Sequence, residues 1–277
     1  MSEFILVTGA SGKTGRALVA ELAKQGAAVR AVVRREQAIT GASDVWVGDV
    51  TQPESLRPAL QGCVAVYHIC PNMHPAEVQI GTAMIALAHS AGIRRFAYHS
   101  VLHPYTQAMP HHWNKLLVEE QLLMSGLDFT ILQPTAYYQN LLAYWTAMQA
   151  GEYTTPYAVH AAISLVDLRD VAQVAARVLL ETGHSAGSYA LVGCEALDQQ
   201  AVADLAGQAL GKQVTARSTG IAQWQAQNTH LPTYARDTLA AMFQFYEDFG
   251  LAGNSRVLTH LLGQAPRTLA DFFAELV

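Results

Sequence analysis

Short apolar runs alternate with amphipathic segments through the first half of the chain. Each run has the length and composition of a strand that is buried on both faces of a sheet. Strands are expected at residues 4–7, 27–33, 45–49, 63–69, 93–100 and 128–132. Segments of helical period separate them, at residues 16–24, from 52–54 onward, 75–91 and 110–125. Strands that alternate with helices of this length predict an α/β fold, a doubly wound parallel Rossmann sheet with right-handed crossovers.

The pattern loosens after Tyr137, and we find no internal repeat, low-complexity tract or linker. The later elements are expected as a helix through 148, strands near 163–167 and 188–192, a helix at 169–181, and a mostly helical stretch from 195 with a possible strand at 213–216. We therefore predict a Rossmann domain over residues 1–150, to which 163–193 return. Residues 151–162 and 194–277 are expected to form a smaller, mostly helical C-terminal lobe.

Glycines mark the loop after the first strand. Gly9, Gly12 and Gly15 are each three residues apart, and a helical segment follows them. Glycine permits unusual backbone angles, close approach of a ligand, and tight packing of the helix on the strand. The free N–H groups and positive dipole end of that helix favour an anion. A dinucleotide pyrophosphate site is thus predicted from the consecutive residues Gly9, Ala10, Ser11, Gly12, Lys13, Thr14 and Gly15.

Two other interpretations of this loop compete. Residues 12–14, Gly-Lys-Thr, suggest the P-loop of nucleoside triphosphatases, but that motif needs a glycine five residues earlier, where this chain has Val7. The loop could also be a glycine-rich turn with no ligand. The strand before it and the helix after it favour the dinucleotide site.

Basic residues follow the second strand. Arg34 and Arg35 stand where an NAD-preferring site usually has Asp or Glu, and the first acidic residue, Glu36, comes late. Arginine suits a ribose 2′-phosphate, and Lys13 in the glycine loop adds positive charge. We therefore predict NADP (NADPH) rather than NAD as the cofactor. The alternative is that both arginines are simply solvated at a strand end.

Candidate ligand-facing residues also follow the third and fourth strands. Ligands of open α/β sheets lie outside the carboxyl ends of the strands. Asp49 ends the third strand and is placed to reach an adenine, while Cys70 and Pro71 directly follow the fourth and are expected over the cofactor. A cysteine beside a cofactor would fit a redox sensor, although a buried, unreactive thiol is commoner.

Composition narrows the class of protein. Of 277 residues, 51% are hydrophobic and only 14% are charged, which predicts a sizeable core. The net charge of −5, with Lys and Arg spread along the chain, argues against nucleic acid as a partner. The first residues run straight into a strand and no apolar run is long enough for a membrane span, so we expect a cytoplasmic protein. Three cysteines in no metal-binding spacing favour a reducing compartment, and no metal site is predicted.

Seven motifs occur in order along nearly the whole chain: TGASGKTG at 8–15, VVRR at 32–35, GDV at 48–50, HSV…HP at 99–104, HHWNKLLVEEQLLMSGLDFTILQP at 111–134, VDLRDVA at 166–172 and PRTLADFFAEL at 266–276. With them the chain resembles the NmrA-like branch of the atypical short-chain dehydrogenase/reductases. The resemblance implies a Rossmann core that binds NADP and a smaller lobe that closes over the nicotinamide end. The cofactor contacts that it implies beyond the glycine loop are Arg34, Asp49, Val50, Ile69, Cys70, Pro71, Lys115 and Pro134.

The resemblance also implies an active site. Ordinary short-chain dehydrogenases carry Tyr-x-x-x-Lys, in which lysine holds the ribose and tyrosine passes a proton; here His111 replaces the tyrosine and Lys115 is retained. Both lie on one helix face, and His111 could supply a proton or merely cap the helix. Lys115 could instead pair with Glu119, four residues on. Ser100 matches the catalytic serine of the superfamily, or simply hydrogen-bonds a turn.

Tyr137, Tyr138 and Asn140 follow the sixth strand and are expected to line a substrate pocket, unless the aromatic rings belong to the lobe core.

Three functions remain in competition. The missing tyrosine leaves open NADPH-dependent reduction of a small electrophile such as a quinone, whose reduced product can take its proton from water. The alternative is a non-catalytic NADP(H)-sensing regulator with a protein partner. A nucleotide-sugar epimerase or dehydratase comes last, because it needs the tyrosine.

Overall fold

The computed structural model describes residues 3–277, and the chain forms two compact units. The first unit consists of Met1–Tyr105, His112–Gln133 and Val171–Tyr189. The second consists of Thr106–His111, Pro134–Asp170 and Ala190–Val277. Within the described part of the chain, no helix combines the length and the hydrophobicity that crossing a bilayer requires.

A seven-stranded sheet forms the centre of the first unit. Its strands are β1 (Phe4–Val7), β2 (Ala28–Val33), β3 (Asp44–Val47), β4 (Cys63–His68), β5 (Arg95–His99), β6 (Phe129–Pro134) and β10 (Gly187–Leu191). They run in the order β10-β6-β5-β4-β1-β2-β3, and the pairs from β3 through β6 are parallel. This order reverses next to β1, as in dinucleotide-binding Rossmann sheets. The predicted fold class is confirmed.

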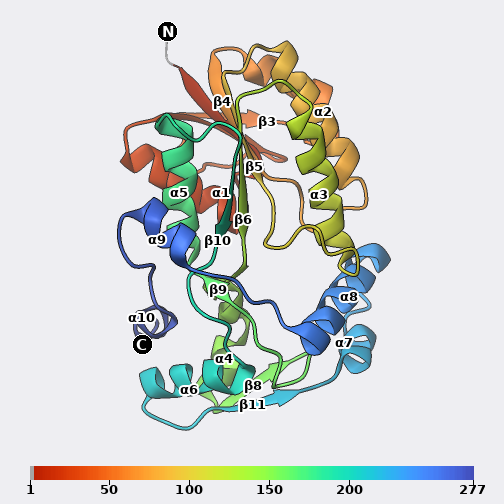
Figure 1. The fold of residues 1–277 in the computed structure, drawn as a ribbon, viewed down its shortest axis with the longest axis vertical. Helices are drawn as coiled ribbons and strands as arrows, with labels where there is room; N and C mark the ends of the chain where they lie inside the picture. Colours follow the sequence, from red (N-terminus) through yellow and green to blue (C-terminus); the bar gives the residue numbers. More distant parts are fainter. Residues whose placement is uncertain (1–2) are drawn as a thin grey trace. The chain divides into compact units, whose positions relative to one another are not determined.

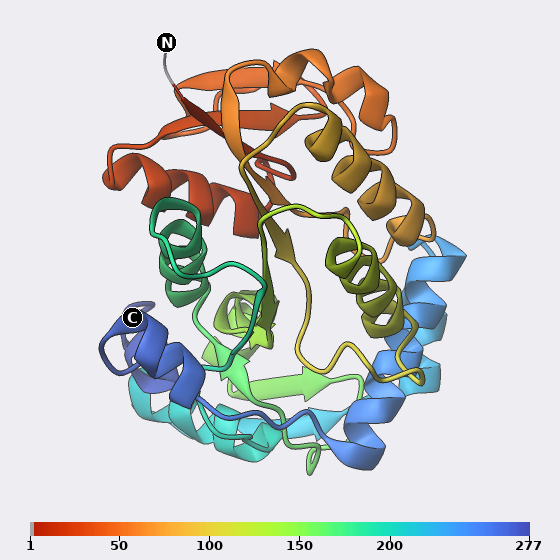
Figure 2. The same cartoon turned by 45° about the horizontal axis from the view of Figure 1, so that its top comes forward.

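Helices cover both faces of this sheet, as Figures 1 and 2 show: α1 (Lys13–Lys24) and α5 (Leu168–Leu180) on one, and α2 (Glu77–Ser90) and α3 (Pro110–Leu123) on the other. The core between the sheet and α2 includes Leu6, Val66, Phe96 and Met84, all fully buried. Gly81 lets α2 and α3 approach closely, because a Cβ there would lie 2.6 Å from Val118 Cγ1.

One predicted helix of this unit is wrong. After β3 the chain makes two short 3₁₀ turns, Pro53–Leu56 and Pro58–Leu60, instead of an α-helix beginning near residue 52. Proline can open a helix, but inside one it has no backbone N–H to donate. Pro58 therefore cannot continue the hydrogen bonding of the turn that Pro53 opens, and a second short turn begins there although Arg57 between them keeps the αR conformation.

The second unit contains two small parallel sheets. β7 (Ala136–Tyr137) pairs with β9 (Leu165–Val166), and β8 (Glu152–Thr155) pairs with β11 (Thr215–Ser218). Its helices are η3 (Tyr138–Tyr144, 3₁₀), α4 (Trp145–Gln149), α6 (Gln199–Leu210), α7 (Ile221–Gln227), α8 (Thr233–Phe249), α9 (Arg256–Leu262) and α10 (Leu269–Ala274). Residues 134–150, which the sequence analysis places in the Rossmann domain, group with this unit because the chain leaves β6 to pair with β9.

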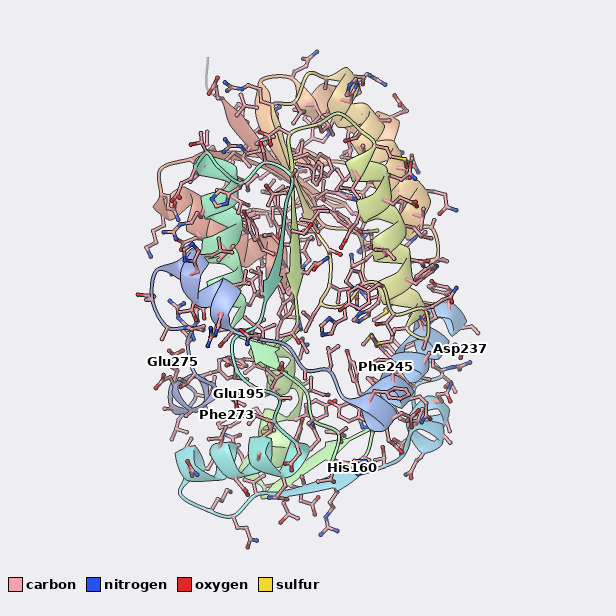
Figure 3. All side chains as sticks on the ribbon, viewed as in Figure 1. His160, Glu195, Asp237, Phe245, Phe273 and Glu275 are labelled. Atoms are coloured by element: carbon pink, nitrogen blue, oxygen red, sulfur yellow. The ribbon has the colours of Figure 1, made fainter. Side chains whose placement is uncertain are left out.

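The C-terminal helix is fastened inside the second unit by rings and charges. The Trp145 ring stacks on Phe273, which is labelled in Figure 3, at 5.7 Å between centroids. The buried Asp170 carboxylate accepts hydrogen bonds from both the guanidinium and the backbone N–H of Arg267. Arg169 bridges Asp167 and Glu275. These contacts hold the PRTLADFF segment against the first residues of α5, although the two are far apart in the sequence.

Candidate functional site

The glycine loop lies at the carboxyl end of β1, and each glycine has a distinct backbone role. Gly9 has φ +62°, in the left-handed region that favours glycine. Gly12 is the N-cap of α1 and makes no side-chain cap hydrogen bond. A Cβ on Gly15 would overlap the carbonyl oxygen of Gly9 and lie 2.6 Å from Ala10 Cα. The loop therefore places the N-terminus of α1 at the carboxyl end of β1, the arrangement that binds a phosphate.

Thr8 fastens this loop to the end of β4. Its hydroxyl donates to the carbonyl of Ile69 (3.0 Å) and accepts from the N–H of the same residue (2.8 Å). Because the hydroxyl has only one proton, it must also accept from Nδ1 of His68, 3.1 Å away. His68 is therefore protonated on Nδ1, and its fully buried Nε2 has no hydrogen-bond partner among residues 3–277. Burial, followed by the positive charge of Lys115, lowers the pKa of His68 to about 3.

We expect His68 to make the protein sensitive to mild acid. An unfolded histidine binds a proton near pH 6.5, whereas the folded one stays neutral to about pH 3, so stability is lost as the pH falls between these values. At about pH 5 the loss amounts to roughly 2 kcal/mol. Urea unfolding at about pH 7.5 and pH 5 measures it. His68→Phe is expected to flatten the difference, whereas His89→Gln, at an exposed position, should leave it unchanged; equal slopes in all three proteins would refute the assignment.

Basic side chains follow β2 as predicted. Arg34 and Arg35 are both exposed. Asp49, half-buried beyond β3, accepts a hydrogen bond from the backbone N–H of Thr51 (2.9 Å), and the neighbouring Val50 is buried. Two exposed guanidinium groups therefore follow β2, and one carboxylate follows the neighbouring strand β3.

A buried ion pair lies beneath the carboxyl ends of β4 and β5. The ammonium of Lys115 is 2.6 Å from Oε1 of Glu77 and donates to the carbonyl of His99 (3.0 Å). The hydroxyl of Tyr98 donates to the same Glu77 oxygen (3.3 Å). Lys115 is 5% exposed and Glu77 is 1% exposed. The possible pairing of Lys115 with Glu119 is therefore wrong, since Lys115 turns toward α2 rather than along its own helix.

Glu119 instead holds Ser100. The Ser100 hydroxyl donates to Oε1 of Glu119, and the side-chain amide of Gln133 donates to both carboxylate oxygens at 3.0 Å. Ser100 and Glu119 are buried, and burial raises the pKa of Glu119 against the opposing effect of these hydrogen bonds. The arrangement fixes Ser100 at the end of β5 with its only proton directed to a carboxylate.

The loop after β4 contains the remaining predicted residues of this unit. Ile69 and Pro71 are half-buried and Cys70 is buried. Burial, followed by the negative charge of Glu77, raises the pKa of the Cys70 thiol to about 12. A thiol so protected is neutral at physiological pH and a poor nucleophile, which disfavours the redox-sensor role for this cysteine.

Several predicted residues belong to the second unit. His111 is the second residue of α3 and is 9% exposed, and Pro134 ends β6 as a buried residue. Tyr137 is half-buried in β7 and Asn140 is exposed. Tyr138 is fully buried, donates its hydroxyl to the carbonyl of Arg267 (3.2 Å), and packs against Phe272. For Tyr138 the core interpretation fits better than a pocket wall.

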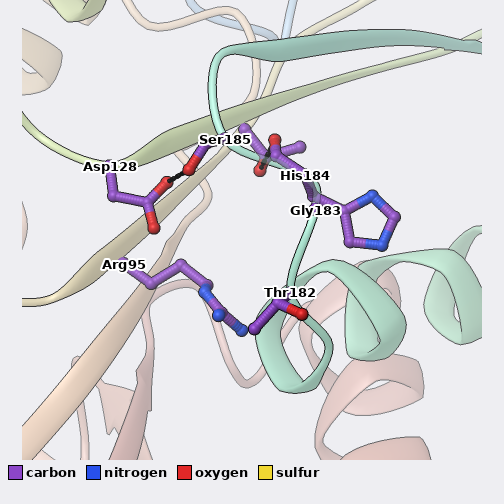
Figure 4. Close-up of a pocket in the computed structure, with 7 residues that line it drawn as sticks. Arg95, Asp128, Thr182, Gly183, His184 and Ser185 are labelled. Carbon is purple, nitrogen blue, oxygen red and sulfur yellow. Dashed lines mark hydrogen bonds between the residues drawn. The ribbon is translucent and has the colours of Figure 1, made fainter.

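A small polar cavity of about 150 Å³ occurs at the opposite ends of the strands. Figure 4 shows its lining, which includes Arg95, the first residue of β5, and Asp128, just before β6. Arg95 donates to the carbonyl of Leu179 near the C-terminal end of α5 (2.6 Å), and Ser185 donates to Asp128. These polar groups satisfy one another and tie the α5–β10 loop to the sheet. Ligands of open α/β sheets lie at the other edge, so this cavity is not the candidate site.

The glycine loop and the strand order define a Rossmann-type dinucleotide-binding fold. Within residues 3–277, no three His, Cys, Asp or Glu side chains are grouped to hold a metal ion. The NmrA-like family model matches residues 1–273, and the chain belongs to that family. The resemblance drawn from the motifs is thereby confirmed.

Two relatives of known activity match nearly the full length. The chain is 30% identical to the NAD(P)H azoreductase of Xenophilus azovorans, over 97% of this chain and 96% of that one. It is also 30% identical to quinone oxidoreductase 2 of Escherichia coli, over 98% of both. The solved structure of the Escherichia coli NADPH-dependent quinone oxidoreductase in complex with NADPH superposes with a TM-score of 0.85, covering 98% of this chain and 99% of that one at 29% identity.

Proposed function

We propose that this protein is an NADPH-dependent reductase of a small electrophile, with quinones as the first substrate class to test. The observation that carries the proposal is the loop at β1, where Gly9 is left-handed, Gly12 caps α1 and Gly15 allows no side chain. Full-length similarity to an NAD(P)H azoreductase and a quinone oxidoreductase supports the same activity. The first relative is named as an azoreductase that uses NAD(P)H, and the second as a quinone oxidoreductase.

The residues present fit a bound NADPH. The N–H groups of the glycine loop would hold the pyrophosphate, and Arg34 with Arg35 would neutralise the 2′-phosphate. Asp49 would lie toward the adenine, and the Lys115 ammonium would donate to the nicotinamide ribose. The cofactor would supply a hydride. The protein would bind and orient this cofactor, and it would keep the ammonium of Lys115 in place.

The position of the Ser100 proton favours a substrate that needs no protein acid. The hydroxyl gives its one hydrogen to Glu119, so toward a ligand Ser100 offers lone pairs while that carboxylate is ionised. A reduced quinone is a stabilised anion that can be protonated by water. An unactivated ketone would need a proton donor within hydrogen-bond reach, and position 111 lacks the tyrosine hydroxyl that supplies it in ordinary short-chain dehydrogenases.

The test is a titration of the purified protein with NADPH, NADP and NADH, followed by NADPH oxidation in the presence of a panel of quinones. We expect tight NADPH binding and turnover with at least one quinone. The turnover rate should be lower in Lys115→Ala, and His111→Ala is measured in parallel. Binding without turnover on any electrophile would refute the reductase. Absence of NADPH binding would refute cofactor and activity together.

We expect cofactor selectivity to depend on Arg34 and Arg35. Replacing both with Ala removes two exposed guanidinium groups that would pair with the 2′-phosphate, each hydrogen bond to a charged group being worth about 1.5–3 kcal/mol. NADPH affinity should fall by roughly tenfold or more, while NADH affinity changes little. Fluorescence titration of both cofactors measures the ratio. Arg94→Ala, which removes an exposed arginine just before β5, serves as the matched control, and an unchanged ratio in the double variant would rule out this role.

One observation favours a second function. His111 replaces the tyrosine proton donor, as expected of an NADP(H)-sensing regulator without turnover. Such a protein would bind NADP and NADPH with different affinities and would transmit the difference to a protein partner. The same quinone assay separates the two functions.

A further inference from the structure

We infer that Glu77 is the positioning residue of the site, which balances the charge of the Lys115 ammonium and aims it at its ligand. The inference rests on the proposed cofactor function and assigns a role to a residue that no motif in the sequence marks. Its basis is the buried contact of 2.6 Å between Lys115 Nζ and Glu77 Oε1.

The pair is embedded in a polar cluster inside the first unit, made of Thr8, His68, Glu77, Tyr98 and Lys115. Tyr98 is fully buried, donates to Glu77 and lies with its ring 5.2 Å from the Lys115 ammonium. The His68 ring stacks on the Tyr98 ring at 6.0 Å between centroids. Its Nδ1 also forms a hydrogen bond with the hydroxyl of Thr8, next to the glycine loop. The cluster thus connects the loop after β1 to the lysine of α3 through neighbouring buried side chains.

Electrostatics give Glu77 a specific task. Burying an ammonium to this degree is costly unless a counter-charge and hydrogen bonds compensate for the lost hydration. Within residues 3–277, the other titratable groups around Lys115 include the neutral His68 from β4, the thiol of Cys70 after β4, the hydroxyl of Tyr98 from β5, and Glu119 from its own helix. Of these, only Glu119 carries a carboxylate, and it is engaged by Ser100 and Gln133.

The same contacts determine the direction in which the Lys115 ammonium donates its remaining hydrogen. An ammonium has three N–H donors, and Lys115 gives one to Glu77 and one to the carbonyl of His99. Two fixed acceptors determine where the third donor points. Because Glu77 cancels the positive charge, that donor suits a neutral acceptor, such as a ribose hydroxyl, better than a phosphate.

The first experiment measures NADPH binding from about pH 6.5 to pH 9. In Glu77→Gln the ammonium has lost its counter-charge, so the dissociation constant is expected to rise about tenfold or more with pH. The wild type and Glu119→Gln, the matched removal of the neighbouring carboxylate, should change by no more than about twofold. Glu77→Asp keeps the charge on a shorter side chain, so its affinity should be weaker than that of the wild type but equally insensitive to pH. Parallel pH profiles in wild type and Glu77→Gln, or an unaltered affinity in Glu77→Asp, would overturn the inference.

The second experiment needs no cofactor, so it separates this inference from the proposed function. When a folded lysine loses its proton more readily than the unfolded one, stability rises with pH across that range. The urea midpoint of Glu77→Gln should therefore rise from about pH 7 to pH 9.5 relative to the double variant Glu77→Gln/Lys115→Met, which has no lysine to titrate. If the two variants respond alike, Glu77 does not control the charge of Lys115, whatever NADPH does.

Discussion

Gly15→Ala is expected to destabilise the protein by roughly 3 kcal/mol and to abolish NADPH binding. In an ordinary helix this substitution would stabilise by about 1 kcal/mol, since glycine is a poor helix former. Here the added Cβ would overlap the carbonyl oxygen of Gly9 and approach Ala10 Cα to 2.6 Å, and both are backbone atoms that no rotamer change can move. The start of α1 would have to move away from β1, and the loop between them would be displaced.

Urea unfolding and NADPH titration measure the two effects. Gly12→Ala is the matched control, because its Cβ would approach Gly9 O only to 3.3 Å and its φ of −78° suits any residue. We expect that variant to lose no more than about 1 kcal/mol of stability. A Gly15→Ala protein with wild-type stability would contradict the packing that the structure shows.

Lys115→Met is expected to be the most damaging substitution in the polar cluster. It leaves the carboxylate of Glu77, 1% exposed, without its ammonium partner, and breaking a buried pair in this way typically costs about 3–5 kcal/mol. It also removes the proposed donor to the cofactor ribose, which we expect to weaken NADPH binding by roughly tenfold to a hundredfold.

The double variant Lys115→Met/Glu77→Gln tests the cause of the lost stability. Removing both charges should restore more than half of it, while NADPH binding stays weak, because an unpaired buried charge is what destabilises the single variant. Lys24→Met, whose side chain is 73% exposed at the end of α1, should have little effect on either measurement. A double variant less stable than the Lys115→Met single variant would contradict this account.

The pattern along the chain predicted the strands of the main sheet, their parallel arrangement and the helices on its faces. It succeeded there because strands buried on both faces must be apolar runs, and because crossovers between parallel strands must be helical. It was wrong for residues 53–60, where two prolines favour short 3₁₀ turns.

The candidate site likewise has one part that the sequence predicts and another part that it does not. The glycine loop and the arginines after β2 are contiguous in sequence and depend on local backbone geometry, so motif spacing reveals them. The partners of Lys115 and Ser100 are not contiguous. Glu77 is 38 residues from Lys115, and Glu119 is 19 residues from Ser100. Nothing in the local pattern distinguishes Glu77 from a solvated glutamate at the start of a helix.

The sequence by itself therefore determined the fold class and the family, because each depends on periodicity or on residues adjacent in the chain. Only the tertiary structure decided the charge environment of the lysine and the serine. Which carboxylate meets Lys115 depends on how α2 and α3 pack against the same face of the sheet, and Gly81 sets how closely they approach. Helix periodicity pointed to Glu119; packing brought Glu77 to Lys115 and gave Glu119 to Ser100.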